Sequence, residues 1–306
     1  MTPIIFTHYG NTDYLYYTIQ CAKRNCPNSP VVLIGDQDNE SLAKELDIQF
    51  YNLNSFDSEM ISDFNKNYIS ISGQKHIDYK NGKDWLKYVF LRWFIIDSLL
   101  EDLKIKEFWH FDSDTMILED LTKHQVLFQN YDCTEQCLGN CMNGFIKSRI
   151  VTDYCNYILE MFKDTHLVDL NNLEFSNYNK NMALTEMRAF QYFKNKKNVK
   201  STSLNINKET FFDNAFRFSE GFETSLFYDG KPIKKLIHLD GTFYLIRNGN
   251  YIKLITANLS WLPIEFYVFF HETMFANSEL QINEFLEKEI PYSKKLKFSL
   301  KKILKI

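Results

Sequence analysis

Short hydrophobic runs separated by amphipathic segments open the chain. Residues 3–7, 31–34 and 48–53 are runs of mostly apolar side chains, which are typical of buried strands. Between these runs, residues 14–25 and 42–46 carry apolar positions at the spacing of an α-helix. This order of strands and helices predicts a parallel sheet with right-handed crossover connections.

The same alternation continues along the chain. Residues 54–84 are polar and weakly patterned, whereas residues 85–102 predict a strong helix that leads into the apolar run Phe108–Phe111. The remaining predicted elements are helices over 150–162 and 182–193, a loop over the Asn-rich segment 171–181, and strands over 234–238 and 242–246. Together they predict an α/β domain over residues 1–250, with a mostly parallel sheet flanked by helices, and an extension over 251–306.

Two segments of the extension raise the question of a membrane. Residues 254–270 are apolar but interrupted by Asn258, Pro263 and Glu265, whereas a membrane span needs about 20 predominantly apolar residues. We therefore expect that segment to form core or a surface that faces an acceptor. Residues 292–306 place apolar side chains on one helical face and all six lysines on the other. Such a basic amphipathic helix predicts peripheral attachment to the cytoplasmic face of the inner membrane, and a helix that packs on the domain is the alternative.

Composition narrows the class of protein. A length of 306 residues with 45% hydrophobic positions allows a substantial core, and a net charge of -4 gives no footprint of a nucleic-acid-binding protein. The first residues lack the positive charges of a secretory leader, so we expect a cytoplasmic protein with free thiols. The spacing of Cys133, Cys137 and Cys141 is not that of a zinc site. The oligomeric state stays open.

The most informative stretch is the apolar run Phe108–Phe111 followed by Asp112, Ser113 and Asp114. Residues i and i+2 of an extended segment point the same way, so both carboxylates face one spot. They repel each other unless a cation lies between them, and Mn²⁺ or Mg²⁺ takes oxygen ligands. The carboxyl end of a strand is also where open α/β sheets bind ligands. A turn rich in Asp and Ser that merely closes the strand is the alternative interpretation.

Two further segments could contribute to the same site. The loop after the first strand carries Thr7, Tyr9 and Asn11, an aromatic ring among polar groups that could hold a nucleobase. Arg92 is a single cation on an apolar helix face, where it needs an anionic partner. Asp36, Asp112 or a ligand diphosphate could be that partner. The alternative is a surface arginine whose stem lies along apolar neighbours.

A histidine near the end of the chain's last predicted strand pair completes the set. His238 precedes the Asp240-Gly241 turn and could add one imidazole to a two-carboxylate site, a donor set that suits Mn²⁺. Gly241 would allow a phosphate to approach the backbone closely.

With these residues the chain resembles nucleotide-sugar glycosyltransferases of the GT-A fold. Within that fold it is most similar to the family of glycogenin and the bacterial lipopolysaccharide galactosyl- and glucosyltransferases. Asp112-Ser113-Asp114 resembles the D-x-D motif, whose carboxylates hold a divalent metal on the donor diphosphate. Arg92 lies where these families place a basic residue, and His238 resembles the third metal ligand in H-x-x-G-x-x-K-P-W.

The resemblance extends to two more positions and fails at another. Asn143-Gly144 is similar to the N-x-G segment that shapes the donor-sugar pocket, although the intervening residue is missing. Glu186 lies where an acidic motif contacts the sugar. The K-P-W end is absent, so its diphosphate-binding lysine is missing and Arg247 is the possible substitute.

The resemblance implies a metal-dependent enzyme with Mn²⁺ or Mg²⁺ as cofactor. It would transfer a hexose or N-acetylhexosamine from a UDP-linked donor to a glycan or lipid-linked glycan, in the synthesis of surface polysaccharide, lipopolysaccharide or capsule. The family favours retention of the donor configuration, with Glu186 orienting the sugar, whereas an inverting enzyme would use Glu186 as a base. The implied catalytic residues are Glu186 and Asp114; the donor-binding residues are Thr7, Tyr9, Asn11, Asp36, Arg92, Asp112, Ser113, Asn143, Gly144, Gly241 and Arg247; the metal ligands are Asp112, Asp114 and His238.

Three other functions fit the sequence less well. A haloacid-dehalogenase-type phosphatase needs D-x-D-x-T on its first strand, but Thr115 comes one residue too early and the motif lies far into the chain. A sugar nucleotidyltransferase needs a Gly-rich phosphate loop with Arg and Lys, which residues 7–13 lack. An inactive GT-A domain that serves as a carbohydrate-binding or membrane scaffold would not need the Asp112, Asp114 and His238 set.

Overall fold

The computed structural model describes residues 1–76, 82–228 and 231–276. The basic segment 292–306 lies outside these described residues, so its attachment to a membrane stays a prediction. Among the described residues, no helix is both long and apolar enough to cross a membrane.

The central feature is a seven-stranded mixed sheet in the order β3-β2-β1-β4-β7-β6-β8. Its strands are β1 (Ile4–Thr7), β2 (Val31–Gly35), β3 (Gln49–Asn52), β4 (Glu107–His110), β6 (Cys133–Gln136), β7 (Cys141–Lys147) and β8 (Ser201–Ser203). Neighbouring strands from β3 to β4 run parallel, as do β6 and β8, whereas β7 is antiparallel to both of its neighbours. The predicted mostly parallel α/β sheet is confirmed, and β1 lies between β2 and β4.

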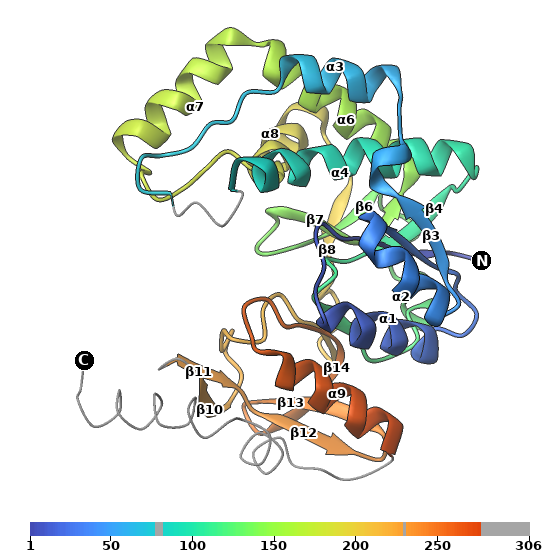
Figure 1. Ribbon diagram of the computed structural model, residues 1–306. Helices are drawn as coiled ribbons and strands as arrows, with labels where there is room; N and C mark the ends of the chain where they lie inside the picture. Colours follow the sequence, from blue (N-terminus) through green and yellow to red (C-terminus); the bar gives the residue numbers. More distant parts are fainter. Residues whose placement is uncertain (77–81, 229–230, 277–306) are drawn as a thin grey trace.

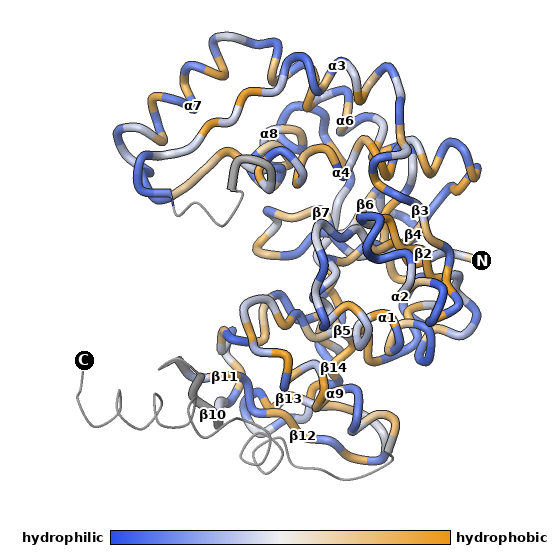
Figure 2. Tube along the Cα trace, in the orientation of Figure 1, coloured by the Kyte–Doolittle hydropathy of each residue, from blue (hydrophilic) through white to orange (hydrophobic). Residues whose placement is uncertain are grey.

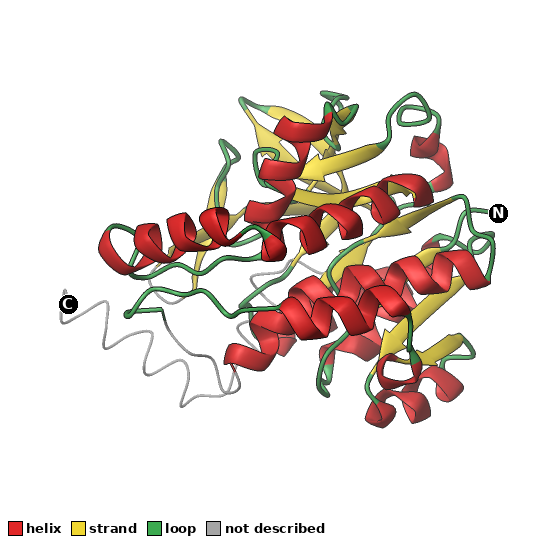
Figure 3. Ribbon diagram, turned by 90° about the horizontal axis from the view of Figure 1, so that it is seen from above, coloured by secondary structure: helices red, strands yellow, loops and turns green. Residues whose placement is uncertain are grey.

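Helices cover both faces of this sheet, as Figures 1 and 3 show. The described helices are α1 (Tyr14–Asn25), α2 (Glu40–Glu45), α3 (Glu59–Asn67), α4 (Gly82–Asp102), α5 (Thr122–Gln125), α6 (Ser148–Lys163), α7 (Thr165–Asn177), α8 (Glu186–Lys197) and α9 (Ile264–Ala276), with 3₁₀ turns η1 (Gln37–Asn39) and η2 (Leu53–Ser55). Side chains of α3, α4, α6, α7 and α8 share one core with Ile5, Val32 and Phe108 of the strands. Their neighbours Ile4 and Phe6 point to the opposite face and pack with α1 and α2. Successive side chains of these buried strands therefore point alternately into two cores, which is the physical basis of the three-layer arrangement.

A second sheet begins where the first ends. It has the order β12-β13-β14-β5, and β9 also pairs with β14. Its strands are β5 (Thr115–Ile117), β9 (Thr210–Phe212), β12 (Leu236–Leu239), β13 (Thr242–Arg247) and β14 (Asn250–Asn258), and a separate hairpin joins β10 (Thr224–Tyr228) to β11 (Lys231–Lys234). The apolar helix α9 packs on this sheet through residues such as Phe266 and Phe270. Figure 1 shows this sheet and α9 at the end of the molecule opposite α3 and α7.

Most predicted elements appear with small shifts of their ends, and the hydropathy pattern that predicted them is visible along the strands in Figure 2. The strand pair around Asp240-Gly241 is confirmed as β12 and β13. The expected loop over 171–181 is confirmed only for 178–181 and is wrong for 171–177, because residues 165–177 form α7. Asp164 caps that helix by accepting from the backbone N–H of Leu167, and Asn171 is buried and donates to the Leu167 carbonyl at 2.8 Å. Tertiary burial thus overrides the low helix propensity of asparagine.

The apolar segment 254–270 is divided between two elements. Its first part is the end of β14, and its last part belongs to α9. Pro263 precedes α9, a position where a proline does not interrupt helical hydrogen bonds. Leu259, Phe266 and Phe270 of this segment are fully buried, so the expectation of core is met for them.

Candidate functional site

The two aspartates lie in the turn that joins the two sheets. Phe111 to Asp114 follow β4 of the central sheet and precede β5 of the second sheet, and the backbone N–H of Thr115 closes the turn on the Asp112 carbonyl at 3.0 Å. Because β1 and β4 are parallel neighbours, the loop after β1 lies beside this turn. One bond joins them directly, since Nδ1 of His8 lies 2.9 Å from Oγ of the buried Ser113. The second His8 nitrogen lies 3.1 Å from Oγ1 of Thr12, so both loops are held together.

Arg92 of α4 extends to this turn and is buried. Its guanidinium donates to Oδ1 of Asp112 at 2.6 Å and to Oε1 of Glu186 at 2.9 Å. The structure thus supplies Asp112, one of the expected partners, and adds Glu186, which the sequence did not link to Arg92. A guanidinium presents its donors in a fixed plane, so it fixes the two carboxylates relative to each other. The alternative of a surface arginine is excluded by its 7% exposure.

Glu186 begins α8 and is buried against the Arg92 guanidinium. Burial raises the pKa of Glu186 to about 7, and the Arg92 charge opposes that rise. The main chain is anchored as well, because the Tyr154 hydroxyl donates to the Glu186 carbonyl at 2.5 Å. Oε2 of Glu186 is buried and has no hydrogen-bond partner among the described residues. A buried acceptor without a partner is costly, so this oxygen is suited to accept from a bound hydroxyl.

Asp114 is held from the opposite side by the second sheet. Ser260 follows β14 and donates from Oγ to Oδ2 of Asp114 at 2.6 Å, and the Leu259 N–H donates to the Asp114 carbonyl at 3.0 Å. Burial raises the pKa of Asp114 to about 6, with a further rise from the charge of Asp112. For Asp112 itself, partial burial raises the pKa but the Arg92 guanidinium outweighs it, so the pKa lies below its ordinary value.

This donor set fits a divalent cation that shares its coordination with a ligand. Oδ1 of Asp114 is buried without a hydrogen-bond partner among the described residues, while the Asp112 side chain is 39% exposed. Mg²⁺ and similar hard cations are commonly held by one or two carboxylates together with substrate phosphates and water. Within the described chain no group of three or more His, Cys, Asp or Glu side chains is placed to hold a metal by itself.

His238 is not brought to the two aspartates. It lies on β12, which β13 and β14 separate from β5, the strand that follows Asp114. At the usual spacing of neighbouring strands, β12 and β5 are about 14 Å apart. That distance is far beyond a metal–ligand bond. The set of three ligands that the resemblance implied is therefore not assembled. Gly241 lies in the turn between β12 and β13, close to His238 in the chain, and is exposed with a φ of 73°.

Arg247 is also placed away from the expected diphosphate role. Its guanidinium lies 3.8 Å from the ring centroid of Phe222, and Nη2 donates to the Glu220 carbonyl at 3.3 Å. These contacts hold Arg247 on the second sheet, at the end of β13.

The loop after β1 carries a partly exposed aromatic ring. Tyr9 is 39% exposed, and its ring stacks on that of Tyr88, with centroids 5.1 Å apart. Asp36, at the end of β2, accepts from the backbone N–H of Gly10 and so orders the loop. Asn11 is exposed beside it, whereas Thr7 is buried at the end of β1. The two loops after β1 and β2 are therefore joined at the edge of the sheet next to Arg92 and Asp112.

Asn143 and Gly144 lie inside the sheet on β7. The Asn143 side chain is buried and donates to Oε1 of Gln136 at 2.7 Å. Gly144 pairs with His110 of β4 and has a φ of 91°. A Cβ there would lie 2.5 Å from Oγ1 of Thr134, so no larger residue fits. Gly144 therefore packs beside β4, the strand that leads to Asp112, and the Asn143 amide is already bonded to Gln136.

Several residues of the site carry no signal in the sequence. His8, Tyr88 and Ser260 reach the site only through tertiary contacts, and Ser260 lies 146 positions from the aspartate it contacts. Their common feature is proximity to a predicted site residue, which a single sequence does not reveal. The apolar segment that contains Ser260 was expected to be core or acceptor-facing surface, and its turn is where the contact forms.

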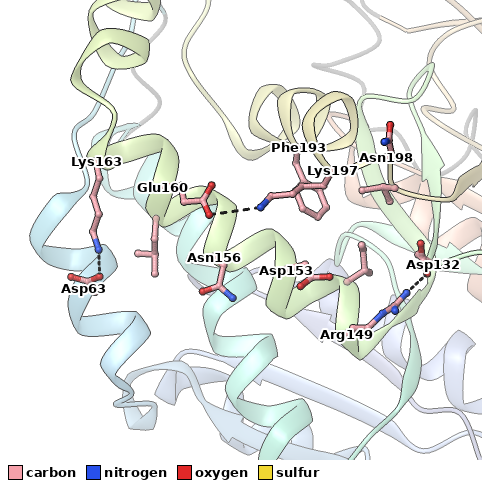
Figure 4. A pocket seen from close by; sticks show the side chains of 13 residues that line it. Asp63, Asp132, Arg149, Asp153, Asn156, Glu160, Lys163, Phe193, Lys197 and Asn198 are labelled. Atoms are coloured by element: carbon pink, nitrogen blue, oxygen red, sulfur yellow. Dashed lines mark hydrogen bonds and ion pairs between the residues drawn. The ribbon is translucent and has the colours of Figure 1, made fainter.

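A separate groove of about 800 Å³ runs along α6 (Figure 4). It is lined mostly by polar side chains, several of which form ion pairs with each other, such as Lys163 with Asp63 at 2.5 Å and Arg149 with Asp132 at 2.8 Å. None of the residues that line it belongs to the site around Asp112 and Asp114. Its paired charges give no reason to assign it chemistry.

Comparison with known proteins gives matches among solved structures alone. No family model and no curated protein matches the chain. Mouse xyloside xylosyltransferase 1 in its apo form matches with a TM-score of 0.44 and 8% identity, over 66% of this chain and 84% of that chain. A cytidylyltransferase from Leptospira borgpetersenii serovar Hardjo-bovis matches with a TM-score of 0.35 and 9% identity, over 66% and 74%. The glycosyltransferase GlyE of Streptococcus pneumoniae TIGR4 matches with a TM-score of 0.37 and 13% identity, over 72% of this chain and 49% of that chain. These similarities are low, and they assign the chain to no family.

Proposed function

We propose that this protein is a glycosyltransferase that moves a hexose or N-acetylhexosamine from a UDP-linked donor to a glycan acceptor. The observation that carries the proposal is the Arg92 network: one buried guanidinium joins Asp112 and Glu186, next to the unpartnered buried oxygen of Asp114. Two carboxylates bound to one fixed cation, with a third two residues from Asp112, are suited to hold a further cation and a polyhydroxylated ligand. The sequence resemblance to the glycogenin and lipopolysaccharide glycosyltransferase family supports the choice of a UDP-linked donor and a glycan acceptor.

Transfer from a nucleotide sugar builds negative charge on the leaving diphosphate. A Mn²⁺ or Mg²⁺ ion held by Asp112 and Asp114 would neutralise that charge. The protein's own contribution is to hold these two carboxylates still before the donor binds. Arg92 fixes Asp112 from the central sheet, Ser260 fixes Asp114 from the second sheet, and each leaves one carboxylate oxygen for the ion. His238 has no part in this proposal, because its strand is too far from Asp114.

Glu186 is proposed to orient the donor sugar through its unpartnered Oε2. A general base for an inverting reaction must reach the acceptor hydroxyl. Glu186 is instead buried, and its other oxygen is bound to Arg92. This placement favours a hydrogen bond to a sugar hydroxyl, and with it a retaining reaction in which no such base is needed. Tyr9 and Tyr88 form the surface proposed for the uracil ring.

The first experiment measures release of UDP from a panel of UDP-hexoses and UDP-N-acetylhexosamines, with and without Mn²⁺. We expect metal-dependent release, and we expect Asp114→Asn to lower it by orders of magnitude because the carboxylate ligand is lost. The matched control is Asp240→Asn, since Asp240 is exposed in the β12–β13 turn and asparagine tolerates its φ of 49°.

Three outcomes contradict the proposal. Release of inorganic phosphate indicates a phosphatase, and formation of pyrophosphate from UTP and a sugar phosphate indicates a nucleotidyltransferase. Absence of all these reactions, with glycan binding intact, indicates a scaffold. The variant His238→Ala tests the metal site separately. Activity close to that of the wild type agrees with the geometry. Loss of the Mn²⁺-dependent activity would instead show that His238 is a metal ligand, as the sequence resemblance implied.

A further inference from the structure

Two exposed aromatic rings lie beside the contact that holds Asp114. Phe218 is 52% exposed and Trp261 is 63% exposed, which is unusual for side chains of this size. The Arg217 guanidinium carbon lies 5.1 Å from the Phe218 ring centroid and 5.0 Å from that of Trp261. One guanidinium therefore joins two exposed rings that come from two separate loops. We refer to Arg217, Phe218 and Trp261 as the aromatic platform.

Trp261 keeps its position at a conformational cost. Its φ is 67°, in the left-handed region that a bulky side chain rarely adopts. Backbone conformations of this kind persist where the surrounding structure imposes them, and they cluster at ligand sites. Here the turn is imposed by Asn258, whose side-chain oxygen accepts from the Ser260 N–H at 3.0 Å, and by the Leu262 N–H, which donates to the Leu259 carbonyl at 2.9 Å.

The platform is continuous with the proposed donor site. Ser260, which donates to the Asp114 carboxylate at 2.6 Å, directly precedes Trp261. The loop of Phe218 is joined to the same turn, because the Phe216 N–H donates to the Asn258 carbonyl at 2.8 Å. The loops that carry the two rings are therefore bonded to the turn that holds Asp114.

A buried lysine holds the loop that carries Arg217 and Phe218. Lys234 is fully buried, and its ammonium group contacts the carboxylates of Asp213 and Glu220 and donates to the Ala215 carbonyl at 2.9 Å. These three partners lie at the start, middle and end of the loop 213–220. Asp213 also accepts from the Asn258 N–H at 3.0 Å, which joins this loop to the turn of Trp261. A charged group buried among its partners gives a fixed geometry, so the platform is pre-formed.

We propose that the aromatic platform is the acceptor subsite and that it binds a sugar ring of a glycan. One face of a pyranose ring presents C–H groups and packs on aromatic rings, while its hydroxyls at the rim bond to polar groups such as Arg217. The nucleobase has its own surface on Tyr9, at the end of β1 on the Arg92 side of the aspartates. The inference rests on the proposed function in naming the bound sugar as the acceptor. Binding of a sugar at the platform can be measured without it.

The test compares wild-type protein with Trp261→Ala and Phe218→Ala on an array of immobilised oligosaccharides, followed by calorimetric titration of the best binder in solution. We expect each variant to weaken binding by about tenfold, since one stacked ring contributes on the order of the energy that corresponds to a factor of ten. Tyr251→Ala is the matched control: Tyr251 is 55% exposed at the start of β14 and outside the platform, so binding should be unchanged. Circular dichroism shows whether each variant is folded.

The outcomes separate the subsite from the enzymatic activity. If wild-type protein hydrolyses UDP-sugars but no oligosaccharide binds in a Trp261-dependent manner, the subsite is overturned and the proposed function stands. If oligosaccharides bind through Trp261 but no donor is turned over, the subsite stands and the proposed function fails. If Trp261→Ala weakens binding of UDP instead, the platform stacks the base and the assignment to a sugar is wrong.

Discussion

Replacing Arg92 with methionine tests whether the guanidinium organises the site. Methionine has a similar apolar stem but no charge, so the change removes both ion pairs and preserves most of the packing. Breaking a buried ion pair by removing one partner costs about 3–5 kcal/mol, because the other charge is left buried and unpaired. Arg92 is 7% exposed and the Glu186 side chain is 10% exposed, so this pair falls in the buried class. The Asp112 side chain is 39% exposed, and water compensates for much of its loss.

The cost depends on pH because Glu186 can bind a proton instead of staying charged. Burial already raises the pKa of Glu186 to about 7, above the ordinary value of a glutamate. A raised carboxylate pKa means that the folded state holds a proton which the unfolded state releases. The contribution to stability is therefore complete below the unfolded pKa and is lost as the pH rises through the folded pKa. Without Arg92 the folded pKa rises further, so the loss continues above pH 7 at about 1.4 kcal/mol per pH unit.

We therefore expect Arg92→Met to lower the free energy of unfolding by about 3 kcal/mol at pH 8 and by about 1–2 kcal/mol at pH 6. Urea denaturation at both pH values measures it, and the same change in a Glu186→Gln background should lose the pH dependence. The matched control is Arg149→Met, which removes a pair with Asp132 whose arginine side chain is 75% exposed, at a cost of about 0–1 kcal/mol. If Arg92→Met costs no more than Arg149→Met at pH 8, Arg92 does not hold the site.

Three further predictions follow from other parts of the chain. Gly144→Ala should lower the free energy of unfolding by about 3 kcal/mol, because its Cβ would lie 2.5 Å from Thr134 Oγ1. The control Gly221→Ala, where a Cβ would have no atom within 4 Å, should lower it by about 1 kcal/mol. Equal effects of the two changes in urea denaturation would contradict this prediction. Burial lowers the pKa of His8 to about 4, so the stability that neutral His8 confers is complete above pH 6.5 and is lost as the pH falls toward 4. His8→Gln should therefore flatten the acid limb of the Tm–pH profile, and an unchanged limb would show that His8 does not cause this pH dependence. Deletion of 292–306 should reduce co-sedimentation with anionic vesicles, and unchanged partitioning would remove the membrane prediction.

The sequence predicts the parallel half of the fold because its strands are buried on both faces. Such strands are continuous apolar runs in the sequence, as residues 31–34 are. The helices between them are long enough to show the spacing of apolar residues that is typical of an α-helix. The second sheet could not be predicted in the same way. Its β12–β13 pair follows a local turn signal, but β5 and β9 both pair with β14 from far along the chain, and no local pattern encodes those two pairings. Helix α7 was missed because its buried face depends on tertiary contacts of polar residues such as Asn171.

In the candidate site too, residues with a local sequence signal could be predicted, whereas those that depend on tertiary contacts could not. Asp112 and Asp114 were predictable because two carboxylates after a buried strand are a local signal, and Arg92 was predictable as a lone cation on an apolar face. The metal-ligand role of His238 was inferred from its place before the Asp240-Gly241 turn and from a motif resemblance, and the strand order of the second sheet places it elsewhere. The side chains that hold Asp114 arise from a turn whose geometry depends on its neighbours, as the contact of Ser260 shows.

The balance of charge in the site links these observations. Asp112, Asp114 and Glu186 bring three carboxylates to one guanidinium, so the site has an excess of negative charge when all are ionised. Burial and this excess raise the pKa of Asp114 to about 6 and, mainly through burial, that of Glu186 to about 7. Two groups thus hold protons more tightly than ordinary carboxylic acids, and a bound cation would displace them by supplying the missing positive charge. Affinity for Mn²⁺ should therefore rise with pH through this range, and Asp114→Asn should remove most of that dependence.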